Sequence, residues 1–299
     1  MSKFPIKSAL AIGLLVCIWG ISWPIYKAAL TFTPPLLFAG MRALMGGVLL
    51  TLILMPSWRK IKWREHWRKY SIGALFNAFF FYGFQTAALL FLPGGLSSVL
   101  VFLQPVLVAL FAWLWLGEQM SILKMIGMLF GFLGILIISM DGFTGTLSPI
   151  GIIIALMGAV SWALGTVYVK TVSKQVDALW LVAIQFTLGG AVLTGMGMTT
   201  ENVSDIVWNL PYINGLVFGG VFGVAVAFGL YFKLIHAGEA GKIASFTFLV
   251  PVIAVISGNI FLKEPFTLSL LTGLALIVLS ISLVNYPVGG RKIKKKLSA

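Results

Sequence analysis

Charged residues and cysteine are scarce in this chain of 299 residues. Only 10% of the residues are charged, eight of them acidic, and the single cysteine is Cys17. A soluble domain carries about 25% charged residues because its surface faces water, so a soluble protein is excluded. A lone cysteine excludes an intramolecular disulfide framework. The chain also lacks zinc-protease, nucleophile-elbow and phosphate-loop motifs, so we expect neither an enzyme nor a bound cofactor or metal.

Hydrophobic residues make up 60% of the chain. They gather in blocks of about 20 residues, the length that a helix needs to cross a hydrocarbon core of roughly 30 Å. We count ten such blocks, at about 8–30, 34–56, 70–92, 95–117, 122–140, 148–170, 178–199, 210–235, 241–262 and 267–287. The sequence therefore predicts an all-α membrane protein with ten transmembrane helices.

The basic residues are divided unevenly between the two predicted faces. If the N-terminus is cytoplasmic, 18 of the 21 Lys and Arg residues fall on the cytoplasmic side. Because Lys and Arg concentrate in cytoplasmic loops, this predicts a multi-pass protein of the cell membrane (inner or plasma membrane) with both termini inside. We interpret the basic and aromatic segment 58–70 and residues 291–296 of the basic tail 288–299 as contacts with anionic lipid headgroups, not with nucleic acid.

The two halves of the chain resemble each other. In the early helices of each half, a displacement of 143 relates Trp19 to Trp162, Lys27 to Lys170 and Arg42 to Gln185. In the late helices, a displacement of 146 relates Gln104-Pro105 to Val250-Pro251 and Glu118 to Glu264. The halves, 1–141 and 146–287, each hold five predicted spans. Because five is odd, the second half must be inverted, and inverted repeats are typical of secondary transporters.

These residues resemble a known family. The segment WGISWPIYKAAL (19–30), Arg42, the run 87–138 and its second-half echo 233–279 are similar to the ten-helix EamA-type members of the drug/metabolite transporter superfamily. The resemblance covers essentially the whole chain. It implies a transporter with two EamA repeats, and many members export amino acids or related metabolites.

Arg42 is the one ionisable residue clearly inside a predicted span, and no acidic residue lies deep enough to pair with it. Embedded charges are costly and usually functional. An unpaired guanidinium would bind a carboxylate or phosphate through two parallel hydrogen bonds. The alternative is a structural role, in which Arg42 binds carbonyl groups near a broken helix. The missing acid argues against proton-coupled export of cationic drugs.

Further candidates for a transport cavity are polar and aromatic residues in the middle of spans. Asn77, Phe81 and Gln85 are spaced four apart and predicted to share one helix face. The remaining candidates are Trp19, Tyr82, Gln104, Trp162 and Gln185, with Pro105 and Pro251 as helix breaks beside a cavity. For each of these residues the alternative is packing or hydrogen bonding between helices.

Several other residues are predicted to be structural. We expect Glu118 and Glu264 to accept hydrogen bonds from helix ends or loops, and Lys27 and Lys170 to extend toward opposite interfaces. Gly215, Gly219 and Gly223 form a small-residue ridge that predicts close helix packing.

The sequence thus predicts a secondary transporter that moves a small-molecule substrate by alternating access, and family analogy favours export of amino acids or related zwitterionic or anionic compounds. A translocator of lipid-linked or nucleotide sugars from the same superfamily, or a membrane assembly protein, stays an alternative. The sequence indicates no particular oligomeric state.

Overall fold

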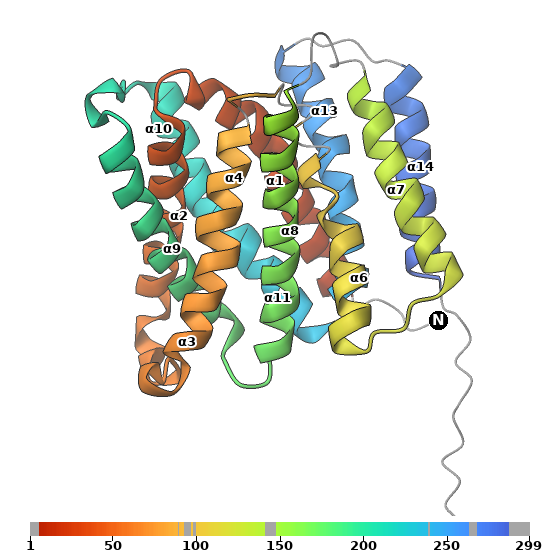
Figure 1. Ribbon diagram of the computed structural model, residues 1–299, viewed down its shortest axis with the longest axis horizontal. Helices are drawn as coiled ribbons and strands as arrows, with labels where there is room; N and C mark the ends of the chain where they lie inside the picture. Colours follow the sequence, from red (N-terminus) through yellow and green to blue (C-terminus); the bar gives the residue numbers. More distant parts are fainter. Residues whose placement is uncertain are drawn as a thin grey trace, which may run out of the picture.

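The computed structural model describes residues 6–88, 90–92, 97, 100–140, 148–238, 240–262 and 268–286. These residues form helices and short connections, without a strand. The helices run side by side, roughly along one direction, and form a bundle (Figure 1). This agrees with the predicted all-α class.

Equivalent helices follow one another in the same order in the two repeats. The first repeat contains α1 (Ile6–Leu30), α2 (Pro35–Leu54), the 3₁₀ turn η1 (Met55–Lys60), α3 (Trp63–Gly73), the π-helical segment η2 (Ala74–Phe80), α4 (Phe81–Ala88), α6 (Gln104–Leu116) and α7 (Ile122–Met140). The second contains α8 (Pro149–Val172), α9 (Ala178–Thr200), the 3₁₀ turn η3 (Val203–Asp205), α10 (Leu210–Val217), the π-helical segment η4 (Phe218–Phe228), α11 (Gly229–Ala237), α12 (Ala240–Ser245), the 3₁₀ turn η5 (Phe246–Phe248), α13 (Leu249–Leu262) and α14 (Leu268–Val284).

Five helical stretches among the described residues are by themselves long and apolar enough to cross a membrane. They are Ile6–Leu30, Pro35–Ile61, Pro149–Val172, Ala178–Thr200 and Leu210–Ala237. Shorter apolar helices occupy four of the other five predicted spans, and α3, η2 and α4 follow one another through the span 70–92. Pro105 lies in the first turn of α6, and Pro251 lies in the first turn of α13, directly after η5. A proline without a backbone N–H is tolerated in a first turn, so each predicted helix break sits where a helix restarts.

Polar side chains fix several helix starts. Ser148 accepts a hydrogen bond from the Gly151 backbone N–H at the start of α8, and Asp177 accepts from two N–H groups of α9. Glu201, at the end of α9, accepts hydrogen bonds from the Leu36 and Leu37 N–H groups in the first turn of α2. These contacts satisfy donors that a helix start leaves without a partner.

Helices α2 and α9 are repeat counterparts and cross at glycine residues. A Cβ on Gly47 would overlap the backbone of Phe186 and Thr187, and a Cβ on Gly190 would overlap the backbone of Ala43 and Leu44. A displacement of 143 converts the first set of contacts into the second. Because the contacting residue numbers rise on one helix as they fall on the other, equivalent helices are antiparallel. The repeats are therefore inverted, and their pseudo-two-fold axis passes through this crossing.

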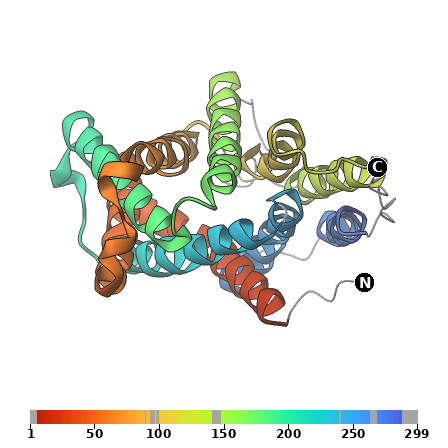
Figure 2. The same ribbon diagram turned by 90° about the horizontal axis from the view of Figure 1, so that it is seen from below.

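Helices α7 and α14 form a second pair of repeat counterparts, at one side of the bundle (Figure 2). A Cβ on Gly134 would lie 2.7 Å from the Gly273 carbonyl oxygen, and a Cβ on Gly127 would lie 3.0 Å from that of Ser280. A displacement of 146 relates these two contacts. Glycine thus permits close approach of both pairs of symmetry-related helices.

The two ends of the bundle carry different charges. The basic end comprises residues 57–69 and 173–177, joined by an ion pair of Lys60 with Asp177 at 3.6 Å. The opposite end comprises residues 31–34 and 201–209, where the Val207 N–H donates to the Phe32 carbonyl. The predicted lipid-binding segment 58–70 lies at the basic end, whereas the tail 288–299, its segment 291–296 and Glu264 lie outside the described residues.

Large apolar side chains cover the outside of the bundle. Leu52, Trp115, Leu129 and Ile153 are each more than half exposed. In water such a surface would be costly, whereas lipid tails match it. The bundle is therefore built to stand in a membrane.

Candidate functional site

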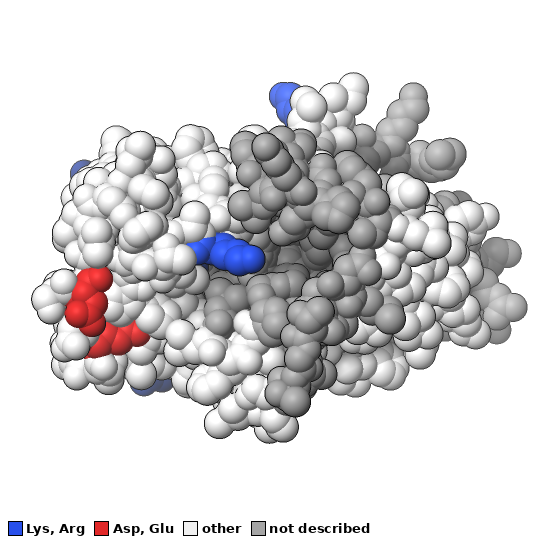
Figure 3. Space-filling model, turned by 90° about the horizontal axis from the view of Figure 1, so that it is seen from above, with Lys and Arg blue, Asp and Glu red and all other residues white. Residues whose placement is uncertain are grey.

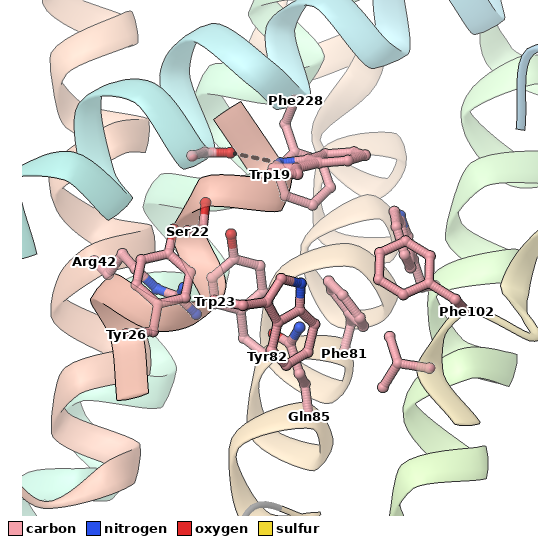
Figure 4. Close-up of a pocket in the computed structure, with 13 residues that line it drawn as sticks. Trp19, Ser22, Trp23, Tyr26, Arg42, Phe81, Tyr82, Gln85, Phe102 and Phe228 are labelled. Atoms are coloured by element: carbon pink, nitrogen blue, oxygen red, sulfur yellow. Dashed lines mark hydrogen bonds between the residues drawn. The ribbon is translucent and has the colours of Figure 1, made fainter. Parts of the chain in front are cut away.

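A cavity of about 50 Å³ lies between the repeats (Figure 4). It is lined by thirteen residues, ten from the first repeat and three from the second: Trp19, Ser22, Trp23, Tyr26, Arg42, Phe81, Tyr82, Gln85, Val101, Phe102, Trp162, Gly223 and Phe228. This volume holds several water molecules, so a metabolite requires the walls to move apart.

Arg42 is the charged residue of the cavity and is 4% exposed. Its guanidinium carbon lies 4.0 Å from the centroid of the Tyr26 ring and 4.6 Å from that of Tyr82. Among the described residues Arg42 makes no hydrogen bond or ion pair, and its Nε is buried without a partner. The alternative of bonding to carbonyl groups is therefore not seen in this part of the chain. The π-faces hold the cation and leave its N–H donors unused.

The aromatic wall is centred on Trp19 and Trp162, which are repeat counterparts. Their rings meet edge to face with centroids 5.5 Å apart, so this contact in the cavity lining lies at the pseudo-two-fold axis. Phe228 contacts Trp19 edge to face at 4.9 Å, and Phe81 stacks on Trp162 at 4.7 Å. The Trp19 Nε1–H donates to the Gly223 carbonyl oxygen at 3.2 Å, whereas the buried Trp162 Nε1 has no partner among the described residues.

Two predicted site residues face each other outside the cavity lining. Asn77 and Gln185 are fully buried, and the Asn77 Nδ2 donates to the Gln185 Oε1 at 3.2 Å. In the described part of the chain, the Asn77 Oδ1 and the Gln185 Nε2 have no partner. Asn77 belongs to the π-helical segment η2, whose i to i+5 bonding interrupts the face predicted for Asn77, Phe81 and Gln85. Phe81 and Gln85 line the cavity, and Asn77 contacts α9 instead.

Gln104 also lies outside the cavity lining. Its Nε2 donates to the Tyr231 hydroxyl oxygen at 3.0 Å and to the Thr166 Oγ1 at 3.3 Å, so it links α6 with α8 and α11. All three side chains are fully buried. Pro105, which follows Gln104, and Pro251 are buried in first helical turns and do not line the cavity either.

Comparison with known proteins gives the family. The EamA-like transporter family matches residues 6–140 and 149–286, one match for each repeat. The chain belongs to the EamA-like transporter family. Its two family matches correspond to the two inverted sets of helices.

Relatives of this EamA-like transporter include other transporters. It is 50% identical to the "Uncharacterized transporter YvbV" of Bacillus subtilis, over 93% of this chain and 92% of that protein. It is 29% identical to "Protein PecM" of Dickeya dadantii, over 90% of this chain and 89% of that protein. A solved crystal structure with 18% identity superposes with a TM-score of 0.79, over 93% of this chain and 97% of that one, and supports the fold.

Half of the aromatic lining of this EamA-like transporter was not predicted from the sequence. Trp23, Tyr26, Phe102 and Phe228 line the cavity, but aromatic residues are common in every span of an apolar chain. One signal does point to Tyr26 in hindsight. A Cβ on Gly223 would overlap the Tyr26 hydroxyl, and one on Gly219 would overlap Arg42, so the glycine ridge on η4 makes room for the cationic site.

Proposed function

We propose that this EamA-like transporter moves small metabolites that carry a carboxylate, namely amino acids and related zwitterionic or anionic compounds, by alternating access. The observation that carries the proposal is Arg42, a buried cation held by tyrosine rings, without an acidic partner in the described chain, in a cavity between the inverted repeats. A substrate carboxylate would complete this site.

The chemistry of the cavity suggests how such a substrate binds. Guanidinium and carboxylate form two parallel charge-assisted hydrogen bonds, which fix the orientation of the substrate. The rings of Trp19, Trp162 and Phe228 supply an apolar wall for the rest of the molecule, and Gln85 and Ser22 supply polar contacts. An organic cation would be repelled by Arg42, because no carboxylate of the described lining offsets that charge.

The location and direction of transport belong to the same proposal. We place the protein in the cell membrane with its basic end and both termini in the cytoplasm, because Lys and Arg concentrate on that side of membrane proteins. Export is favoured by the resemblance to amino-acid-exporting members of the superfamily. Inverted repeats around a central site allow the cavity to face each side in turn.

Efflux of radiolabelled amino acids from loaded cells, with and without the protein, tests the proposal. We expect Arg42→Gln to lower efflux by about tenfold or more, since a hydrogen bond to a charged group contributes about 1.5–3 kcal/mol. Arg42→Lys should retain part of the activity, because it keeps the charge and loses the planar fork. Lys174→Gln, an exposed substitution at the basic end, is the matched control.

Two outcomes would count against this assignment. Equal efflux from cells with and without the protein, across a panel of amino acids and organic acids, would overturn the substrate class. Loss of folded Arg42→Gln protein in detergent, measured by size exclusion, would assign Arg42 to the structure instead.

A further inference from the structure

The turn that ends α11 is held from one side by a lysine. The Lys170 Nζ of α8 donates to the carbonyl oxygens of His236, at 3.1 Å, and Gly238, at 2.5 Å. A helix C-terminus presents carbonyl groups without intrahelical partners and a negative partial charge, so a cation binds there favourably. Lys170 was expected to extend toward an interface, and its amine binds this turn at the basic end of the bundle.

The same turn is held from the other side by the first repeat. The Glu118 carboxylate accepts hydrogen bonds from the N–H groups of Ala240, at 2.6 Å, and Gly241, at 3.2 Å. It also pairs with Lys124 at 3.7 Å, and both side chains are less than a tenth exposed. We call Lys170, Glu118 and the four turn residues that they bind, His236, Gly238, Ala240 and Gly241, the basic-end clasp. Because Glu118 belongs to one repeat and the turn to the other, the clasp joins the repeats.

Lys27, the repeat counterpart of Lys170, has different surroundings. Lys27 lies at the end of α1 that leads to the opposite end of the bundle, and it is exposed. Within the described residues it makes no hydrogen bond or ion pair. The displacement of 146 relates His236 and Gly238 to Leu90 and Leu92. The carbonyl groups of Leu90 and Leu92 are therefore the repeat counterparts of those that Lys170 binds.

The cavity is also displaced toward the opposite end. Along α1 its lining runs through Trp19, Ser22, Trp23 and Tyr26, up to the residue before Lys27. Seen from the opposite end, acidic side chains lie at one side of the surface and a basic side chain lies nearer its centre (Figure 3).

The pseudo-two-fold axis relates this part of the cavity to a volume toward the basic end, and that volume is filled. The counterparts of Ser22, Trp23 and Tyr26 are Gly165, Thr166 and Val169, which are buried on α8. Thr166 there accepts a hydrogen bond from Gln104. Among the described residues, the cavity thus extends along α1 toward the opposite end, and the symmetry-related volume toward the basic end is filled.

We propose that Lys170 and Lys27 are the two halves of an alternating clasp. In the present conformation Lys170 and Glu118 hold the basic end closed. In the other conformation Lys27 binds the carbonyl groups of Leu90 and Leu92 and closes the opposite end, while Lys170 releases His236 and Gly238. One set of cation–carbonyl bonds forms as the other breaks, so neither state is strongly favoured. The proposal concerns the movement and does not depend on which substrate is carried.

Accessibility of a cavity thiol tests the clasp without any substrate. The background is Cys17→Ala, the reporter is Ser22→Cys in the cavity, and the probe is a small, membrane-impermeant methanethiosulfonate. Labelling is measured in membrane vesicles of both orientations. A separate Asp205→Cys variant identifies the side on which the opposite end lies, because Asp205 is exposed there.

We expect Lys170→Met to reduce labelling of Ser22→Cys from the opposite end severalfold and to raise it from the basic end. Glu118→Gln should act in the same direction, which provides a second variant if Lys170→Met does not fold. Lys27→Met should keep labelling from the opposite end at or above its original level. In the double variant Lys27→Met with Lys170→Met, labelling should return toward the original distribution. Lys174→Met, exposed on the same end, is the control and should change nothing.

The opposite pattern would overturn the clasp. If the folded Lys170→Met and Glu118→Gln proteins label as the background does, the contacts of Lys170 and Glu118 do not hold the basic end closed. If Lys27→Met shifts labelling in the same direction as Lys170→Met, the two lysines are not alternating halves of one device. Because no transport is measured, either result leaves the proposed substrate class to be tested by efflux.

Discussion

The sites around Arg42 and Gln185 are repeat counterparts with opposite characters. In both, the side chain from the second helix of a repeat packs against a glycine of the other repeat: a Cβ on Gly73 would lie 2.7 Å from the Gln185 Oε1, and a Cβ on Gly219 would overlap Arg42. Asn77 and Gly223 are also repeat counterparts, one beside each site. Asn77 donates a hydrogen bond to Gln185, whereas Gly223, beside Arg42, has no side chain.

This difference shows how one scaffold yields two kinds of site. An amide facing an amide closes a helix contact and leaves no space. An arginine facing a glycine leaves a cation that makes no hydrogen bond within the described residues, together with the volume in which a ligand can lie. The two sites occupy equivalent positions of the repeats, so we infer that the polarity and size of two side chains decide which half of the interface becomes the cavity. The predictions below test this comparison.

The largest effect should come from the helix crossing that both sites share. In Gly190→Ala the new Cβ would overlap the backbone of Leu44, which cannot move aside without separating α2 from α9. We expect little folded protein, or a loss of about 3 kcal/mol or more, in line with overpacked cores. Gly195→Ala on the same helix is the control, because nothing lies within 4 Å of its Cβ. Thermal unfolding in detergent measures both, and equal stability of the two variants would contradict the crossing.

A smaller effect is expected at the closed amide pair. Asn77→Leu leaves the buried Gln185 carbonyl oxygen without a donor, which costs about 1–3 kcal/mol. Substrate affinity should change little, since neither Asn77 nor Gln185 lines the cavity. Arg42→Gln should show the reverse, with transport lost and stability kept. A thermal shift and a binding titration on each variant make the comparison, and it fails if Asn77→Leu abolishes binding in a stable protein.

Sequence reasoning identified the repeat because Trp, Lys, Pro and Glu recur in order. It also identified Arg42, Trp19, Trp162, Tyr82 and Gln85, all of which line the cavity. A charged side chain within a span that has no acidic partner must face a cavity or carbonyl groups, so few environments were possible for Arg42.

The buried amides could not be placed in the same way. Asn77, Gln104 and Gln185 are as polar as Gln85, yet they bind one another or other side chains. A neutral amide in a span can be satisfied by a cavity or by a neighbouring helix, and the sequence does not state which helices are neighbours. The π-helical segments η2 and η4 add to the difficulty, because they rotate the faces of the third helix in each repeat and have no recognised sequence signal.

The smallest effect should separate the two tryptophans on the axis. Trp19→Phe removes the hydrogen bond from Nε1 to the Gly223 carbonyl, whereas Trp162→Phe removes a buried donor that has no protein partner. Both substitutions shrink a ring in the same aromatic cluster, so the packing loss is shared and the difference between them isolates the hydrogen bond. We expect Trp19→Phe to be the less stable variant by about 1 kcal/mol. Thermal unfolding of the purified variants measures the difference. Equal stability would mean that the two tryptophans are equivalently bonded, and the asymmetry of the interface would then rest on Arg42 and Gln185 alone.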